Sequence, residues 1–186
     1  DTEILVETAL TKITEMRVSE GKGLDLGTGT GAIALALAKE MPAMHWLGVD
    51  YSADAIELAQ SNARKNNIQN CQFKQSNWFS EVPSNDYAII VSNPPYIDPA
   101  DQHLQEGDVR FEPESALIAQ DKGLADLALI INNAPHYLTP NGVLLLEHGY
   151  DQSDWVLTEL ARTGFVNCQT IKDLGGKDRV SLGYLL

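Results

Sequence analysis

The chain has 186 residues, a formal net charge of −13, 44% hydrophobic residues and 21% charged residues. This length and composition suit one globular domain with one core, so we assign residues 1–186 to a single domain. The negative charge disfavours direct binding to nucleic-acid phosphates, and no apolar run is long enough to cross a bilayer. Cys71 and Cys168 lack metal-ligand spacing, so we interpret them as free thiols of a reducing, cytoplasmic compartment and expect no metal site.

Helical and strand patterns alternate along the chain. In order, they are helix 3–18, strand 23–26, helix 31–40, strand Trp46–Val49, helix 53–66, strands Cys71–Lys74 and Tyr87–Ser92, helix 124–138, strand Val143–Glu147, helix 152–163, and strands 165–171 and 179–185. Ser52 can cap the helix that follows it, and Asn66 and Asn67 can end that helix. Pro140-Asn141-Gly142 is typical of a turn.

This alternation predicts an α/β fold with a mostly parallel sheet and helices on both faces. The last two strands follow each other without a helix and are separated by Asp-Leu-Gly-Gly-Lys-Asp at 173–178. We therefore expect an antiparallel hairpin at the C-terminal end of the sheet. The stretch 97–123 has no periodic pattern, and loops of that length are usually functional or disordered.

A glycine-rich loop joins the first strand to the second helix. Its sequence is D-L-G-T-G-T-G over residues 25–31, and the second strand ends on Asp50. Glycines let the backbone turn tightly and approach a ligand, and a helix N-terminus offers free N–H groups. A carboxylate at the end of the next strand can accept hydrogen bonds from both hydroxyls of a ribose. The pattern predicts an adenosine-type ligand; the alternative is a tight turn with an unrelated surface Asp.

The glycine spacing indicates which adenosine ligand binds. Dinucleotide sites favour G-x-G-x-x-G, whereas G-T-G-T-G resembles the first motif of S-adenosylmethionine-dependent methyltransferases. In that family the loop lies against the amino-acid and ribose parts of the cofactor, and the adenine pocket usually follows the third strand. Asn77 and Trp78 stand there, and they can supply an acceptor oxygen for the adenine amino group and an aromatic wall. Simple core packing is the alternative for Trp78.

The apolar strand Tyr87–Ser92 ends on Asn93-Pro94-Pro95-Tyr96. In an open α/β sheet, ligands bind beyond the carboxyl ends of the strands, so this corner is expected beside the methyl donor. The Asn93 side-chain oxygen and the Pro94 carbonyl can accept both hydrogens of a planar –NH2 group and aim its nitrogen. The prolines stiffen the corner, and the Tyr96 ring can stack on a flat amide or base. Seen alone, the tetrapeptide could be only a turn that ends the strand.

In this setting Asn-Pro-Pro-Tyr resembles methyltransferases that modify planar nitrogens, either adenine N6 in nucleic acids or glutamine in proteins. The closer resemblance is to the release-factor glutamine N5-methyltransferase family. It is carried by D-T-E-I-L-V-E at 1–7, the glycine loop, V-S-N-P-P-Y-I-D at 91–98, G-D-V-R-F-E-P at 107–113, L-L-L-E-H-G at 144–149 and D-R-V-S-L-G at 178–183. The resemblance implies a Rossmann-like class I methyltransferase fold. The family also carries a small N-terminal helical domain that helps to hold the substrate, so we expect a trimmed chain.

The resemblance implies methyl transfer from S-adenosylmethionine to the glutamine of the Gly-Gly-Gln motif of bacterial peptide-chain release factors 1 and 2, with S-adenosylhomocysteine as product. It assigns cofactor binding to Gly27, Thr28, Gly29, Thr30, Gly31, Asp50, Asn77, Trp78 and Asn93. It assigns substrate binding to Asn93, Pro94, Pro95 and Tyr96, with Asn93, Pro94 and Tyr96 as the catalytic residues. The family usually has Asp at position 77, and Asn77 keeps an acceptor oxygen there.

The segment 97–123 is expected to cover the peptide-binding cleft. Phe111 and Pro113 would shape the cleft, and Arg110 and Glu112 would pair with each other or with neighbouring backbone. His148 is a weaker candidate for a pocket-lining residue. An exposed acidic loop is the alternative for the whole segment.

Four other functions are alternatives to the release-factor activity. They are methylation of a glutamine in a ribosomal protein, N6-adenine methylation of nucleic acid, nicotinamide-dependent oxidation and cofactor binding without catalysis. The acidic charge and the lack of a basic patch disfavour nucleic acid. The glycine spacing disfavours a nicotinamide cofactor, and the intact tetrapeptide disfavours a binding module. The segment Arg110–Pro113 favours the release factor over the ribosomal protein.

Overall fold

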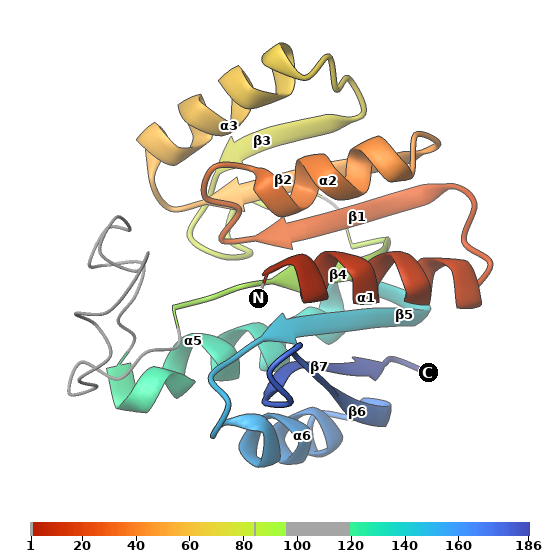
Figure 1. Ribbon diagram of the computed structural model, residues 1–186, viewed down its shortest axis with the longest axis vertical. Helices are drawn as coiled ribbons and strands as arrows, with labels where there is room; N and C mark the ends of the chain where they lie inside the picture. Colours follow the sequence, from red (N-terminus) through yellow and green to blue (C-terminus); the bar gives the residue numbers. More distant parts are fainter. Residues whose placement is uncertain (1, 84, 96–119) are drawn as a thin grey trace.

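Within the part of the chain that the structure describes, seven strands form one sheet (Figure 1). The computed structural model describes residues 2–83, 85–95 and 120–186. The strands are β1 (Gly21–Leu26), β2 (Met44–Asp50), β3 (Cys71–Gln75), β4 (Tyr87–Ser92), β5 (Leu138–Glu147), β6 (Val166–Lys172) and β7 (Asp178–Tyr184). Their order in the sheet is β3-β2-β1-β4-β5-β7-β6.

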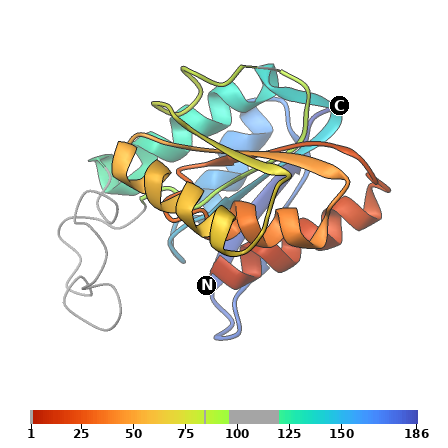
Figure 2. The ribbon, with the colours of Figure 1, turned by 90° about the horizontal axis from the view of Figure 1, so that it is seen from above.

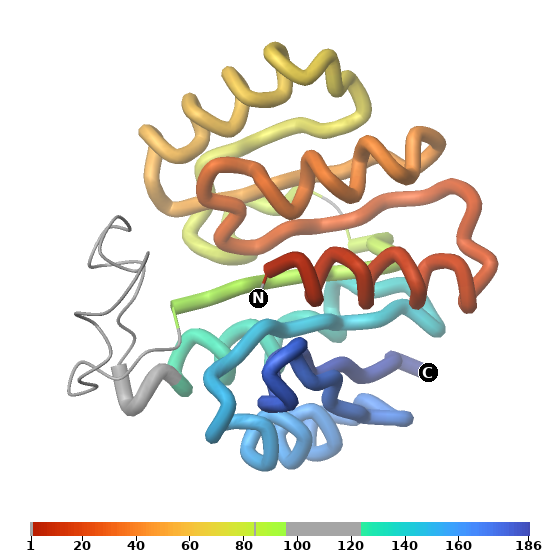
Figure 3. The backbone as a smooth tube through the Cα atoms, in the orientation of Figure 1, coloured from red at the N-terminus to blue at the C-terminus, as the bar shows by residue number. Residues whose placement is uncertain are grey.

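The strand directions confirm the predicted sheet. Strands β1 to β5 pair in parallel, whereas β7 pairs antiparallel with both β5 and β6. The chain runs outward from β1 through β2 to β3 and then returns to place β4 on the other side of β1 (Figure 3). The order therefore reverses between β1 and β4, and such a switch point is where open α/β sheets bind ligands.

Helices cover both faces of the sheet, as the sequence predicts (Figure 2). They are α1 (Thr2–Glu15), α2 (Ala32–Glu40), α3 (Ala53–Lys65), α5 (Gln120–Asn133) and α6 (Ser153–Arg162), with a 3-10 turn, η3, at Ala134–His136. Successive strand residues point to opposite faces. On β4, Ile89 and Val91 pack in the core that includes α1 and α2, whereas Ile90 packs in the core that includes α5 and α6.

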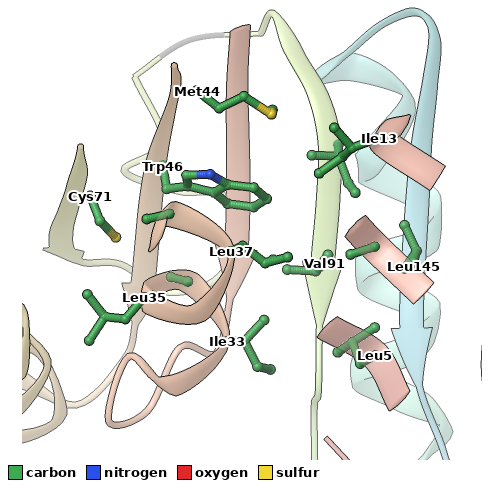
Figure 4. Packing of buried hydrophobic residues seen from close by; sticks show 14 of the residues in the cluster. Leu5, Ile13, Ile33, Leu35, Leu37, Met44, Trp46, Cys71, Val91 and Leu145 are labelled. Atoms are coloured by element: carbon green, nitrogen blue, oxygen red, sulfur yellow. The ribbon is translucent and has the colours of Figure 1, made fainter. Parts of the chain in front are cut away.

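Helix α1 is anchored over the middle of the sheet. Its fully buried residues Leu5 and Ile13 lie in the same core as Val91 of β4 and Leu145 of β5 (Figure 4). Because these apolar contacts lie along one side of the helix, they fix both its position and its rotation. The first turn of α1 consequently lies beside the carboxyl end of β4 (Figure 1).

The expected turn at Pro140-Asn141-Gly142 is wrong, because these residues lie inside β5. The ladder pairs Tyr87 with Leu138 and then Ile89 with Val143, so β5 carries extra residues that form a bulge. Asn141 has φ 63°, and its N–H donates to the Leu185 carbonyl at 2.7 Å. These turn-forming residues thus form a bulge within β5, and the backbone groups of Asn141 and Gly142 are hydrogen-bonded to Leu185 near the end of the chain.

Helix boundaries agree with the sequence at one helix and differ at another. The Ser52 hydroxyl accepts from the Ala55 N–H at 3.3 Å, and α3 ends before Asn66 and Asn67, as expected. The helix expected over 124–138 ends at Asn133 instead, and a 3-10 turn follows it. Pro135 lies in the first residues of that turn, where its missing N–H breaks the α-helical hydrogen-bond pattern.

Candidate functional site

The glycine loop adopts a backbone that residues with side chains rarely take. Gly27, Gly29 and Gly31 have φ values of 70°, 53° and 81°. A Cβ on Gly31 would lie 2.9 Å from the Phe73 ring and 3.0 Å from the Ala59 Cβ, so that position has no room for a side chain. A Cβ on Gly29 would meet nothing within 4 Å. The loop is therefore packed closely on its inner side and open at Gly29, as a ligand cradle requires.

The end of β2 is tied directly to this loop. The two carboxylate oxygens of Asp50 accept from the Gly29 N–H and the Ser52 N–H, both at 2.9 Å. Asp50 is half-buried. A carboxylate oxygen has two acceptor positions, so each can still accept from a hydroxyl. The sequence predicted Asp50 as a ligand residue, but it did not indicate that Asp50 also holds the loop.

Asp25, which the sequence analysis left without a role, is a buried carboxyl beneath the loop. Its Oδ2 accepts from the Thr28 hydroxyl at 2.6 Å and from the Ala34 N–H at 3.3 Å, whereas its Oδ1 has no partner among the described residues. Burial raises the pKa of Asp25 to about 7; the Thr28 and Ala34 hydrogen bonds oppose this rise, and the nearby Asp50 charge adds to it. Asp25 thus holds Thr28 and the first turn of α2 in place through these two hydrogen bonds.

Replacing Asp25 with Asn is expected to change the pH dependence of stability. The folded wild type holds a proton on Asp25 from the ordinary value of 3.8 up to about 7, so its free energy of unfolding falls as pH rises through that window. Asn keeps an acceptor for Thr28 and Ala34 but does not ionise. Relative to wild type, Asp25→Asn should therefore gain stability between pH 5 and pH 8, by a few kcal/mol at about 1.4 per pH unit. Urea unfolding at both pH values tests this, and an equal difference at each would contradict it.

The segment after β3 places Trp78 beside the loop. A Cβ on Gly27 would lie 3.4 Å from the Trp78 ring, which is half-buried and also packs against the core on the α5 side. Trp78 has φ 48°, and the Ser76 hydroxyl holds its backbone by donating to its carbonyl at 2.6 Å. Asn77 is exposed beside it. Both uses predicted for Trp78, wall and core packing, are compatible with this position.

Tyr51 is a residue that the sequence analysis missed. It follows Asp50 directly, and the residue is 76% exposed. An exposed aromatic side chain at the carboxyl end of a strand is a candidate wall for a flat ligand group. The signal in the sequence was its place immediately after the expected ribose-binding carboxylate.

The carboxyl end of β4 carries the corner that the sequence predicted. The buried Ser92 hydroxyl donates to the Leu26 carbonyl at 2.7 Å, which joins the end of β4 to the end of β1. Asn93 is half-buried, and its side-chain N–H donates to the Thr2 hydroxyl at 3.4 Å. Among the described residues the Asn93 side-chain oxygen has no hydrogen-bond partner. The corner thus offers an acceptor oxygen at the edge of the sheet where the glycine loop lies.

The structure brings most of the predicted residues to one edge. The glycine loop, Asp50, Asn77, Trp78, Asn93, Pro94 and Pro95 all follow the carboxyl ends of the parallel strands β1 to β4. Pro94 is buried and Pro95 half-buried. Tyr96 and the residues 110–113 lie outside the described residues, so their assignments stay predictions.

His148 does not line an open site. It is fully buried, and its ring nitrogens pair with the Gly149 carbonyl at 2.8 Å and the Ser181 hydroxyl at 2.7 Å. Burial is the main cause that lowers the pKa of His148. The imidazole is therefore a neutral part of the core between β5 and β7.

The described residues, 2–83, 85–95 and 120–186, contain neither a membrane-spanning helix nor a cluster of metal ligands. No helix there is long and apolar enough to span a membrane. No group of three or more His, Cys, Asp or Glu side chains there could hold a metal ion.

Comparison with known proteins decides the family. Residues 18–177 match the family model described as a methyltransferase domain. The chain belongs to the methyltransferase domain family. This domain is 52% identical over 98% of its length to a protein of Shewanella oneidensis named release factor glutamine methyltransferase, and 49% identical over 98% to a protein of the same name from Escherichia coli. It spans 63% and 65% of the lengths of these relatives.

A solved structure agrees with these relatives. The domain matches a crystal structure from Alicyclobacillus acidocaldarius with a TM-score of 0.60 and 27% identity, covering 99% of this chain and 91% of the other. That protein is described as a protein-(glutamine-N5) methyltransferase that is release factor-specific. The fold class and the family resemblance predicted from the sequence are therefore confirmed.

Proposed function

We propose that this methyltransferase domain transfers a methyl group from S-adenosylmethionine to the side-chain amide nitrogen, N5, of the glutamine in the Gly-Gly-Gln motif of bacterial release factors 1 and 2. S-adenosylhomocysteine is the second product. The observation that carries the proposal is the corner after β4, where the Asn93 oxygen, which has no hydrogen-bond partner among the described residues, lies at the carboxyl-end edge of the parallel strands. The named relatives support the choice of substrate.

The residues present fit the cofactor. The glycine loop has open space over Gly29 and a Trp78 ring beside Gly27, and Gly31, the N-cap of α2, makes no side-chain cap hydrogen bond. In the proposal, Gly27, Thr28, Gly29, Thr30 and Gly31 hold the amino-acid part, Asp50 holds the ribose hydroxyls, and Asn77 and Trp78 hold the adenine. S-adenosylmethionine, when bound, supplies a methyl group on a positively charged sulfur.

The corner supplies what an uncharged amide needs in order to react as a nucleophile. The nitrogen lone pair of a carboxamide is delocalised into its carbonyl, so the nitrogen is planar and weakly nucleophilic. Asn93 Oδ1 accepts one hydrogen of the –NH2 group, and the Pro94 carbonyl accepts the other. Two fixed acceptors orient the nitrogen and favour its loss of planarity in the transition state. The nitrogen loses its proton after it has been alkylated, so no charged base is required.

The expected partners are the two release factors, and the expected site of action is the cytoplasm. The net charge of −13 agrees with a protein rather than a nucleic-acid substrate. Tyr96 is proposed to stack on the glutamine amide, and Pro95 to stiffen the corner.

Mass spectrometry tests the proposed function. The chain is incubated with methyl-labelled S-adenosylmethionine and, separately, with release factor, release factor whose motif glutamine is replaced by alanine, a ribosomal protein fraction, and DNA. We expect one label, on the motif glutamine of the release factor, and none on the alanine variant. Label on DNA or on a ribosomal protein instead would overturn the choice of substrate.

A further inference from the structure

Asn93 must present its oxygen, but its position alone does not hold its amide group in place. The backbone around it is fixed, because the Ser92 hydroxyl is bonded to Leu26 and Pro94 has a restricted φ. The amide plane is a separate matter, since the last side-chain torsion of Asn has a broad, roughly two-fold energy profile. An unheld amide would sample orientations in which the oxygen points away from a substrate.

One contact holds this amide plane. The Asn93 Nδ2 donates to the Thr2 hydroxyl at 3.4 Å, and this is the one side-chain hydrogen bond of Asn93 among the described residues. With Nδ2 turned toward Thr2, the oxygen at the other end of the amide points away from it. The pair is separated by 91 positions in the sequence.

Core packing determines where the Thr2 hydroxyl lies. Thr2 is the first residue of α1, and the buried Leu5 on the next turn lies in one core with Val91, two residues before Asn93 (Figure 4). The same apolar contacts that seat α1 on β4 therefore bring its first hydroxyl to the corner. A helix that slipped by one residue would carry the hydroxyl to another side.

We infer that Thr2 is a positioning residue for methyl transfer, because its hydroxyl holds the amide plane of Asn93 with the oxygen directed at the substrate. This inference rests on the proposed function of Asn93. The Thr2 hydroxyl oxygen accepts from Asn93 Nδ2, and this hydrogen bond restrains the plane of the Asn93 amide. The substrate –NH2 group can only donate, so it bonds to the oxygen of the Asn93 amide and not to its nitrogen.

Paired substitutions separate this role from a structural one. Thr2→Val keeps the shape of the side chain and removes the acceptor, whereas Thr2→Ser keeps the hydroxyl. We expect Thr2→Val to lower kcat by about three- to tenfold, the effect of one neutral hydrogen bond, and Thr2→Ser to stay near wild type. The KM and dissociation constant for S-adenosylmethionine should not change in either variant.

A third variant controls for the loss of a threonine hydroxyl from α1. Thr14 lies 12 residues further along the helix, and its hydroxyl donates to the Leu10 carbonyl at 2.9 Å. Thr14→Val should leave kcat unchanged. Thermal unfolding of all three variants establishes that they are folded, and kcat is compared at a temperature where each is native.

Several results would overturn the inference. These are a kcat of Thr2→Val equal to that of wild type, an equal loss in Thr2→Val and Thr2→Ser, and a loss that appears in KM for the cofactor and not in kcat. If the wild type itself transfers no methyl to release factor, the proposed function fails, and NMR of the 15N-labelled Asn93 side chain decides on Thr2. Greater mobility of that amide in Thr2→Val than in Thr14→Val supports the contact, and equal mobility contradicts it.

Discussion

Asn93→Ala is expected to reduce turnover on the order of 100-fold or more while much of the affinity for S-adenosylmethionine is kept. The substitution removes an acceptor that acts on the nitrogen of the substrate, and the loss of one fixed polar group at a reacting centre typically has an effect of this size. Because Ser92 remains bonded to Leu26 and Pro94 is unchanged, the backbone of the corner should stay in place. The effect should therefore appear in kcat.

The measurement is single-turnover methyl transfer to release factor, together with calorimetric titration of the cofactor. Asn133→Ala is a matched control, because Asn133 is exposed at the end of α5 and its side chain donates to the Leu129 carbonyl at 2.8 Å. The control should behave as wild type. Unchanged methyl transfer in Asn93→Ala would show that the Asn93 side chain does not orient the substrate nitrogen.

Asp50→Ala is expected to weaken S-adenosylmethionine binding by about 100-fold or more. Hydrogen bonds to a charged group contribute about 1.5–3 kcal/mol each, and two ribose hydroxyls would lose their acceptor. The Gly29 N–H also loses the carboxylate that holds it at 2.9 Å, so the glycine loop itself becomes less ordered. Both effects lower the affinity for the cofactor, so they precede the methyl-transfer step.

Calorimetry with S-adenosylhomocysteine measures this loss without turnover. Asp54→Ala serves as the control, since Asp54 is exposed in the first turn of α3 and lies four residues from Asp50. Asp50→Asn, which keeps one acceptor oxygen, should bind with intermediate affinity. Equal affinity of wild type and Asp50→Ala would contradict the proposed ribose contact.

The site residues that the sequence predicted at one edge of the sheet share one property, which is their place in the alternating pattern. Gly27 and Asn93 follow a strand and Asp50 ends one, and the carboxyl ends of parallel strands meet at one edge. The alternation of strands and helices therefore predicts that these residues lie together, even though none of their contacts can be read from the sequence. Ser52 and Asn66 were predicted for a similar reason, because helix caps depend on neighbouring residues.

What the sequence did not reveal depends on three-dimensional surroundings. The raised pKa of Asp25 comes from burial, which depends on the packing of α2 on the sheet. The contact of Thr2 with Asn93 joins residues 91 positions apart. At Pro140-Asn141-Gly142 a local turn pattern was overridden by pairing with Leu185 at the end of the chain. Each case requires knowledge of which distant segment lies nearby.

A crystal structure with S-adenosylhomocysteine and a Gly-Gly-Gln peptide tests whether the corner after β4 holds the substrate amide. We predict that the glutamine amide nitrogen lies within hydrogen-bond distance, about 3 Å, of both the Asn93 side-chain oxygen and the Pro94 carbonyl, and faces the cofactor sulfur. A cofactor sulfur far from this corner, or a glutamine held by other groups, would show that Asn93 and Pro94 do not orient the nitrogen.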